Sequence, residues 1–87
     1  MEKVFSTGRE NYNSQIGKFV ANYTKVTTAS NLFVSVEVKN GDDVVFTSSY
    51  DKSNNRYSGG FKKFDAADPK ERVEIVSQVM TDINSIV

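Results

Sequence analysis

An alternating apolar segment followed by a glycine-containing turn constrains this chain more than any other part of its sequence. Val34, Val36 and Val38 alternate with mainly polar residues between positions 32 and 39, and Asn40-Gly41 follows directly. Because successive side chains of a β-strand point to opposite faces, a period of two predicts a strand with one buried face. Asn-Gly is a strong signal for a tight turn between antiparallel strands. The segment therefore predicts a β-hairpin around which the rest of the chain packs.

Two further strands are predicted after this turn, at residues 44–50 and 56–64. Both segments contain β-branched or aromatic residues, and a polar, turn-prone segment at residues 52–55 separates them. Cross-strand partners must point to the same face of the sheet, and this requirement predicts the register of each hairpin. In the first hairpin, across a loop that ends at a left-handed Gly41, the expected pairs are Val36 with Val44 and Val34 with Phe46. In the second hairpin, the expected pairs are Asp51 with Arg56, Tyr50 with Tyr57 and Phe46 with Phe61.

Helix-like segments flank the predicted sheet on both sides. Before it, Thr7 and Glu10 have the spacing of a capping box, which marks the start of a helix. Apolar residues then recur every three or four positions, as on one face of an amphipathic helix. We therefore expect a helix over residues 7–28, whose apolar face contains Tyr12, Ile16, Phe19, Val20, Tyr23 and Val26.

The last segment of the chain predicts a second helix over residues 67–87. Asp68 suits the N-cap, Pro69 suits the first helical position, and Glu71 lies at the third position. Ile75 lies off the expected apolar stripe. That stripe contains Val73, Val76, Val79, Met80, Ile83, Ile86 and Val87.

These elements predict an α+β fold with the order α-β-β-β-α. Residues 32–64 form a three-stranded antiparallel meander, and both helices pack on one face of it. Residues 1–6 form an N-terminal arm, which is either a short edge strand or an ordered extension. The 87 residues are enough for one domain, so we expect residues 1–87 to form a single compact unit.

The composition excludes several kinds of chemistry. The chain contains no histidine and no cysteine, so thiolate or imidazole metal sites and histidine-dependent nucleophiles cannot be built. We therefore expect a protein that is not an enzyme, with no catalytic residues, no metal site and no cofactor. The formal net charge is +0, which is typical neither of a strongly basic nucleic-acid binder nor of an acidic nucleic-acid mimic.

The sequence also predicts a cytoplasmic location. No apolar run approaches the roughly 20 residues that a membrane span needs, and the first residues lack the apolar core of a signal peptide. The absence of cysteine fits a reducing compartment. We expect no membrane interaction.

The face of the sheet opposite the two helices is the expected binding surface. Most of its side chains are small and polar, but Phe33, Val45 and Phe64 are apolar. The sheet also has open edges to which another chain can add a strand. The residues predicted to bind a partner, on this face and beside its edge, are Phe33, Val45, Arg56, Lys62, Lys63 and Phe64.

A small binding protein is the function that these features favour. We expect an inhibitor or regulator that occludes a surface of a larger protein or protein complex. Small cysteine-free domains of this class are typical of phage or mobile-element proteins that act against host defence, such as anti-CRISPR proteins, which would place this one in the host-cell cytoplasm.

Two alternatives remain open from the sequence. Lys62 and Lys63 lie among aromatic residues, a combination that suits nucleic-acid binding. The predicted element order also resembles the topology of the double-stranded-RNA-binding domain, although acidic residues in the first hairpin loop and at the start of the last helix oppose phosphate binding there. The second alternative is a homodimeric structural subunit that associates through Phe33 and Phe64.

Overall fold

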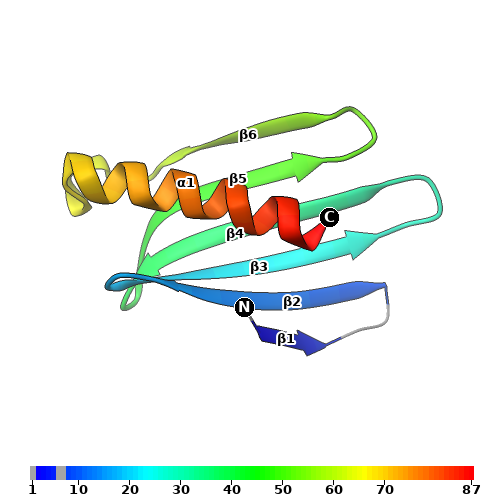
Figure 1. The fold of residues 1–87 in the computed structure, drawn as a ribbon, viewed down its shortest axis with the longest axis horizontal. Helices are drawn as coiled ribbons and strands as arrows, with labels where there is room; N and C mark the ends of the chain where they lie inside the picture. The colour runs from blue at the N-terminus through cyan, green and yellow to red at the C-terminus, as the bar shows by residue number, and fades with distance from the viewer. Residues whose placement is uncertain (1, 6–7) are drawn as a thin grey trace.

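An antiparallel β-meander with one long helix on one of its faces makes up the fold (Figure 1). In this computed structural model, residues 2–5 and 8–87 are described, with side chains for residues 8–63 and 65–87. The strands lie in the sheet in the same order as in the chain. The elements are β1 (Glu2–Phe5), β2 (Arg9–Ile16), β3 (Phe19–Thr27), β4 (Leu32–Asn40), β5 (Asp43–Asp51), β6 (Arg56–Phe61), the short 3-10 helix η1 (Phe64–Ala66) and α1 (Pro69–Ile86).

The predicted helix over residues 7–28 is wrong, because the described part of this segment is the β2–β3 hairpin. Phe19, Ala21 and Tyr23 are buried and alternate with exposed residues, which is the period of a strand. Ile16 pairs with Phe19 across a tight turn in which Gly17 has a φ of +60°. A type II′ hairpin turn needs glycine at this position. The apolar residues have a helical spacing along the chain because two alternating strands follow one another across the Gly17-Lys18 turn.

The α-β-β-β-α order is therefore wrong as well. Strands β2 to β6 form a five-stranded antiparallel meander, which a single C-terminal helix follows. Of the predicted N-terminal arm, Glu2–Phe5 forms β1 and pairs with β2, whereas Thr7, the predicted N-cap, lies outside the described residues. The broader prediction of a small α+β domain with an antiparallel sheet is confirmed.

The register of the second predicted hairpin is confirmed, and that of the first is wrong. Asn40 pairs with Asp43 across a turn that is shorter than expected, and the register then shifts at a β-bulge. Val45 is the extra residue of the bulge, so Val38 pairs with Phe46 rather than with Asp42. A bulge adds one residue to one strand, and it returns the apolar residues of β5 to the core face. The confirmed pairs of the second hairpin are Asp51 with Arg56, Tyr50 with Tyr57 and Phe46 with Phe61.

The predicted N-terminal cap of α1 is confirmed. Asp68 accepts a hydrogen bond from the Glu71 backbone N–H at 2.8 Å, and the Glu71 side chain accepts one from the Asp68 N–H at 3.0 Å. Pro69 occupies the first turn, where its missing N–H has no helical partner to lose. These local contacts begin the helix at the residue that the sequence indicates.

The buried face of α1 differs from the predicted apolar stripe. Ile75 was placed off the stripe, yet it is fully buried. Val73, Val76 and Met80 were placed on the stripe, and they are 69%, 37% and 40% exposed. The residues of α1 that are buried are Ile75, Val79, Asp82, Ile83 and Ile86.

A buried hydrogen bond holds the helix in this rotation. The Tyr23 hydroxyl on β3 donates to Asp82 at 2.6 Å, and Gln78 donates to the other oxygen of the same carboxylate at 2.8 Å. Burial, followed by the hydrogen bond to Asp82, raises the pKa of Tyr23 far above its ordinary value. Near the end of the helix, Lys25 donates to the Ile86 carbonyl at 2.9 Å. A cation at this position also suits the negative end of the helix dipole.

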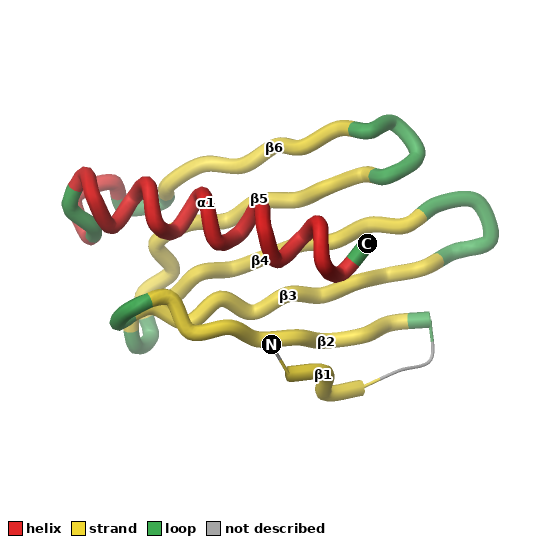
Figure 2. The backbone as a smooth tube through the Cα atoms, in the orientation of Figure 1, coloured by secondary structure: helices red, strands yellow, loops and turns green. Residues whose placement is uncertain are grey.

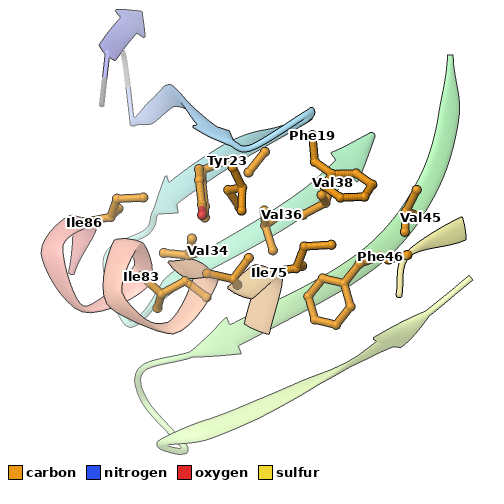
Figure 3. Packing of buried hydrophobic residues seen from close by; sticks show 14 residues of the cluster. Phe19, Tyr23, Val34, Val36, Val38, Val45, Phe46, Ile75, Ile83 and Ile86 are labelled. Atoms are coloured by element: carbon orange, nitrogen blue, oxygen red, sulfur yellow. The ribbon is translucent and has the colours of Figure 1, made fainter. Parts of the chain in front are cut away.

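The core lies between α1 and the middle of the sheet. Val34 and Val36 of β4 lie next to Ile83 and Ile75 of the helix, and Val38 lies beside Phe19 of β3 (Figure 3). Within the views of Figures 1 and 2, α1 crosses the middle strands obliquely and does not cover β6. One helix therefore seals only part of this face.

Gly59 brings β6 unusually close to β5. It pairs with Ser48, and a Cβ added at Gly59 would overlap the Ser48 Cβ and lie 2.8 Å from the Thr47 carbonyl oxygen. A Cβ added at the neighbouring Gly60 would meet no atom within 4 Å. The two glycines therefore have different roles, although they are adjacent in one strand.

We predict that Gly59→Ala lowers the free energy of unfolding by about 1–3 kcal/mol, because β6 must move away from β5 to relieve the overlap. Gly60→Ala is the matched control and should change it by less than about 1 kcal/mol in either direction. Urea denaturation of both variants, followed by circular dichroism, measures the difference. Equal destabilisation by the two substitutions would contradict the close approach at Gly59.

Candidate functional site

The face of the sheet opposite α1 is polar and is covered by no described element. We call it the open face. Its two central rows run across β2 to β6 as direct cross-strand partners. Short hydroxyl and amide side chains dominate it, and antiparallel sheets commonly expose such a face to water. The first row contains Asn11, Thr24, Ser35, Ser49 and Ser58, and the second contains Asn13, Asn22, Glu37, Thr47 and Gly60.

The structure does not bring the predicted partner-binding residues together. Phe33 begins the open face on β4 and is 43% exposed. It lies in one cross-strand row with Asp51 and Arg56. Lys62 and Lys63 follow the opposite end of β6. At about 3.3 Å per residue, Lys62 lies roughly 20 Å from Arg56 along the strand.

One of the predicted residues, Val45, does not lie on an exposed surface. Val45 was expected on the exposed face, but the β-bulge turns it into the core, where it is fully buried beside Phe46 (Figure 3). Phe64 lies in η1, and its side chain lies outside the described ones. Lys63 is held in an ion pair with Asp43 at 3.1 Å. The predicted set is therefore not one binding surface.

A groove between α1 and β6 forms an apolar concave surface among the described residues. We call it the α1–β6 groove. Its volume is about 450 Å³, and Val73 and Val76 form its helical wall. Arg72 donates to the Ala67 carbonyl at 2.6 Å, which holds its long side chain against the start of the helix. The residues that line the groove are Phe61, Pro69, Arg72, Val73, Val76 and Ser77.

The core-facing side of β6 meets the groove at Phe61. Tyr57, Gly59 and Phe61 share this face, because their partners on β5 are Tyr50, Ser48 and Phe46. The rings of Phe46 and Phe61 lie 4.8 Å apart and are tilted by 55°, which anchors one end of β6 to the core. Gly59 has no side chain, and Ser48 of β5 occupies the position that its Cβ would take. The core-facing side of β6 is thus aromatic at both ends, and at Gly59 between them β5 lies against the backbone.

β6 is the last strand of the sheet, so no strand of the described part of the chain lies along its outer side. The Lys62 N–H donates to the Val45 carbonyl at 2.7 Å, which shows that Lys62 points its backbone groups toward β5. Backbone groups alternate in direction along a strand. Ser58 and Gly60 therefore also bond toward β5, while the backbone groups of Tyr57 and Gly59 point outward.

Positive charge lies at both ends of β6. Arg56 begins the strand and Lys62 follows it. Among the described residues, the ion pairs are Lys18–Glu71, Lys39–Glu37 and Lys63–Asp43. Neither Arg56 nor Lys62 belongs to one, so both cations are available to an incoming carboxylate.

The groove was missed in the sequence because its residues were assigned to the core. α1 has more apolar residues than one buried face can contain, and these fall on two adjacent stripes. The full burial of Ile75 and the exposure of Val73 distinguish the stripes. The surplus of apolar residues on α1 was the available signal.

A polar network joins the β3–β4 turn to the β5–β6 turn at the far end of the sheet. Asn31 donates to Asp51 at 2.7 Å and accepts from the backbone N–H of Ser53 at 2.8 Å. Asn54 donates to the other Asp51 oxygen at 2.7 Å. The hydrogen bonds from Asn31, then those from Asn54, lower the pKa of Asp51 below its ordinary value. Asp51 therefore bonds to Asn31 and Asn54, although Arg56 is its cross-strand neighbour on β6.

We predict that Asn31→Ala raises the pKa of Asp51 toward its ordinary value, because the largest cause of the lowered pKa is removed. A lowered pKa in the folded state contributes stability above the ordinary pKa, and this contribution disappears as the pH falls through the folded pKa. The variant should therefore lose less stability than the parent on acidification. An NMR titration of the Asp51 carboxyl measures the pKa directly, and an unchanged value in the variant would contradict the network.

The described residues offer neither a metal centre nor a membrane-spanning helix. No group of three or more carboxylates in the described part of the chain lies close enough to hold a metal ion. Among the described helices, none combines the length and the apolar character needed to cross a bilayer.

Comparisons with known protein families, with curated proteins and with solved structures found no match to this chain. The case for a function therefore rests on the surfaces themselves.

Proposed function

We propose that this chain is a small non-enzymatic protein-binding domain that docks through the α1–β6 groove. The exposure of Val73, Val76 and Met80 on one side of α1 carries the proposal. Contiguous exposed apolar patches mark interaction sites, because burying each square ångström of apolar surface contributes about 25 cal/mol. A partner that fills the groove would bury Val73 and Val76 together with Phe61.

The role that suits such a domain is that of an inhibitor or regulator. With no histidine or cysteine in the chain, an effect on a larger protein is most simply exerted by covering part of its surface. Nucleic-acid binding is less favoured than protein binding, because one of the two lysines proposed for it, Lys63, forms an ion pair with Asp43. The open face is a weaker candidate for a docking site, because short polar side chains gain little from leaving water.

We predict that a photo-crosslinking amino acid at position 73 forms an adduct with one protein partner in cells that naturally produce this chain. The same amino acid at Thr24, on the open face, is the matched control and should form none. Val73→Glu with Met80→Glu should abolish co-purification of the adduct's partner, because charges would be buried against apolar surface. Thr81→Glu, at an exposed position elsewhere on α1, should preserve it.

The adducts are identified by mass spectrometry. Adducts from Thr24 alone would place the binding surface on the open face and contradict the proposal. A partner that is retained by the double glutamate variant would contradict it equally.

A further inference from the structure

We propose that the partner segment bound at the α1–β6 groove is an extended strand with a carboxylate at each end, which pairs with the outer edge of β6. The inference rests on the proposed function and specifies the chemistry of the bound segment. Four features of β6 support it: its backbone direction, its neighbouring groove, its flanking charges and its position at the edge of the sheet.

The backbone of β6 specifies an extended partner. Tyr57 and Gly59 point their N–H and carbonyl groups away from β5, at a strand edge that has no neighbour in the sheet. Such an edge is a template for another strand. Proteins usually protect edges with proline, with inward-pointing charge or with a bulge. None of these occurs within Arg56–Phe61, whose sequence is RYSGGF and whose pairing with β5 is regular.

The groove specifies apolar residues on one face of the added strand. The side chains of an added strand alternate between the two faces of the sheet. Those on the helix side would lie next to Tyr57, Gly59 and Phe61, about 4.8 Å from β6. The side chain opposite Phe61 would then reach the groove at Val73 and Val76, which α1 leaves exposed. One strand would thus satisfy the backbone edge and cover the apolar stripe at the same time.

The charges specify the ends of the added strand. Arg56 and Lys62 bracket β6, and each lies outside the ion pairs of the described residues. They are separated by about 20 Å along an extended chain, which is beyond the Debye length of roughly 8 Å at physiological salt. A single carboxylate cannot therefore serve both, so each end of the partner strand needs its own.

The same charges disfavour a second copy of this chain. Antiparallel pairing of two β6 strands about Gly59 would place Arg56 of one copy opposite Lys62 of the other. Like charges that face each other across a sheet are destabilising. Charge complementarity therefore favours an acidic partner segment over self-association.

The test uses the full chain and a capped synthetic peptide, Glu-Ile-Thr-Val-Thr-Ile-Glu. In antiparallel register, its three apolar residues face the groove and its glutamates lie opposite Arg56 and Lys62. We expect binding to slow the amide hydrogen exchange of Tyr57 and Gly59, measured by NMR, while Ser58 changes little because its N–H already bonds to β5. A matched peptide with lysine at both ends should bind at least about threefold more weakly.

A charge-reversed protein provides the second arm. Arg56→Glu with Lys62→Glu should reverse the preference, so that the lysine-ended peptide binds more tightly. Lys70→Glu, an exposed position on α1, is the control and should retain the original preference. The exchange of specificity does not depend on the absolute affinity of either peptide.

Three results would overturn the inference. The first is peptide binding that shifts Val73 and Val76 without protecting Tyr57 and Gly59, and the second is the absence of binding at millimolar peptide. The third is a dimer, seen by light scattering as twice the monomer mass, that substitutions in β6 dissociate. This result would assign the edge of β6 to a second copy of the chain. In the first two cases the crosslinking experiment at position 73 still decides the proposed function separately.

Discussion

The rotation of α1 about its own axis is the constraint on which the rest of the structure depends. A buried hydrogen bond of 2.6 Å joins Tyr23 on β3 to Asp82 on α1, two residues that are 59 positions apart in the chain. An unpaired buried carboxylate is costly, so the helix is held where Asp82 meets its donors. This rotation buries Ile75 and turns Val73 and Val76 outward. The core and the candidate binding surface are therefore two consequences of one contact.

The imbalance between one helix and a wide sheet creates the surfaces that are available for binding. A helix is about 10 Å wide, whereas neighbouring strands are about 4.8 Å apart, so a single helix covers only part of one face. The middle strands receive α1, and β6 remains at the margin. Phe61 is the residue of β6 that lines the groove beside the helix. The groove thus follows from the architecture as well as from particular residues.

Local signals in the sequence predicted much of the second hairpin and the start of α1. The polar turn at residues 52–55 and the Asp68–Glu71 capping box act over a few residues, so their effect can be read directly from the chain. The β2–β3 hairpin was missed because Gly17-Lys18 is a weaker turn signal than Asn40-Gly41. Several side chains of its strands are also polar, which obscured the period of two.

Tertiary contacts decided the features that the sequence did not predict. A hydrophobic pattern counts Asp82 as a surface residue, so the buried face of α1 was placed at the wrong rotation. The bulge at Val45 is equally invisible to a register argument that assumes one residue per position. Both features affect the candidate binding surface. The rotation of α1 exposes the wall of the groove, and the bulge moves Val45 from the exposed face into the core. Arg56 and Lys62 kept their expected surface positions.

The most direct test of this account compares the accessibility of Val73 and Ile75 on α1. The chain has no cysteine, so Val73→Cys and Ile75→Cys each introduce a unique thiol whose reaction with a thiol reagent can be timed. We predict that the thiol at position 73 reacts nearly as fast as in the denatured protein. The thiol at position 75 should react slower by orders of magnitude, because it becomes accessible only on opening of the fold. Equal rates, or faster reaction at position 75, would contradict the rotation of α1 and with it the α1–β6 groove.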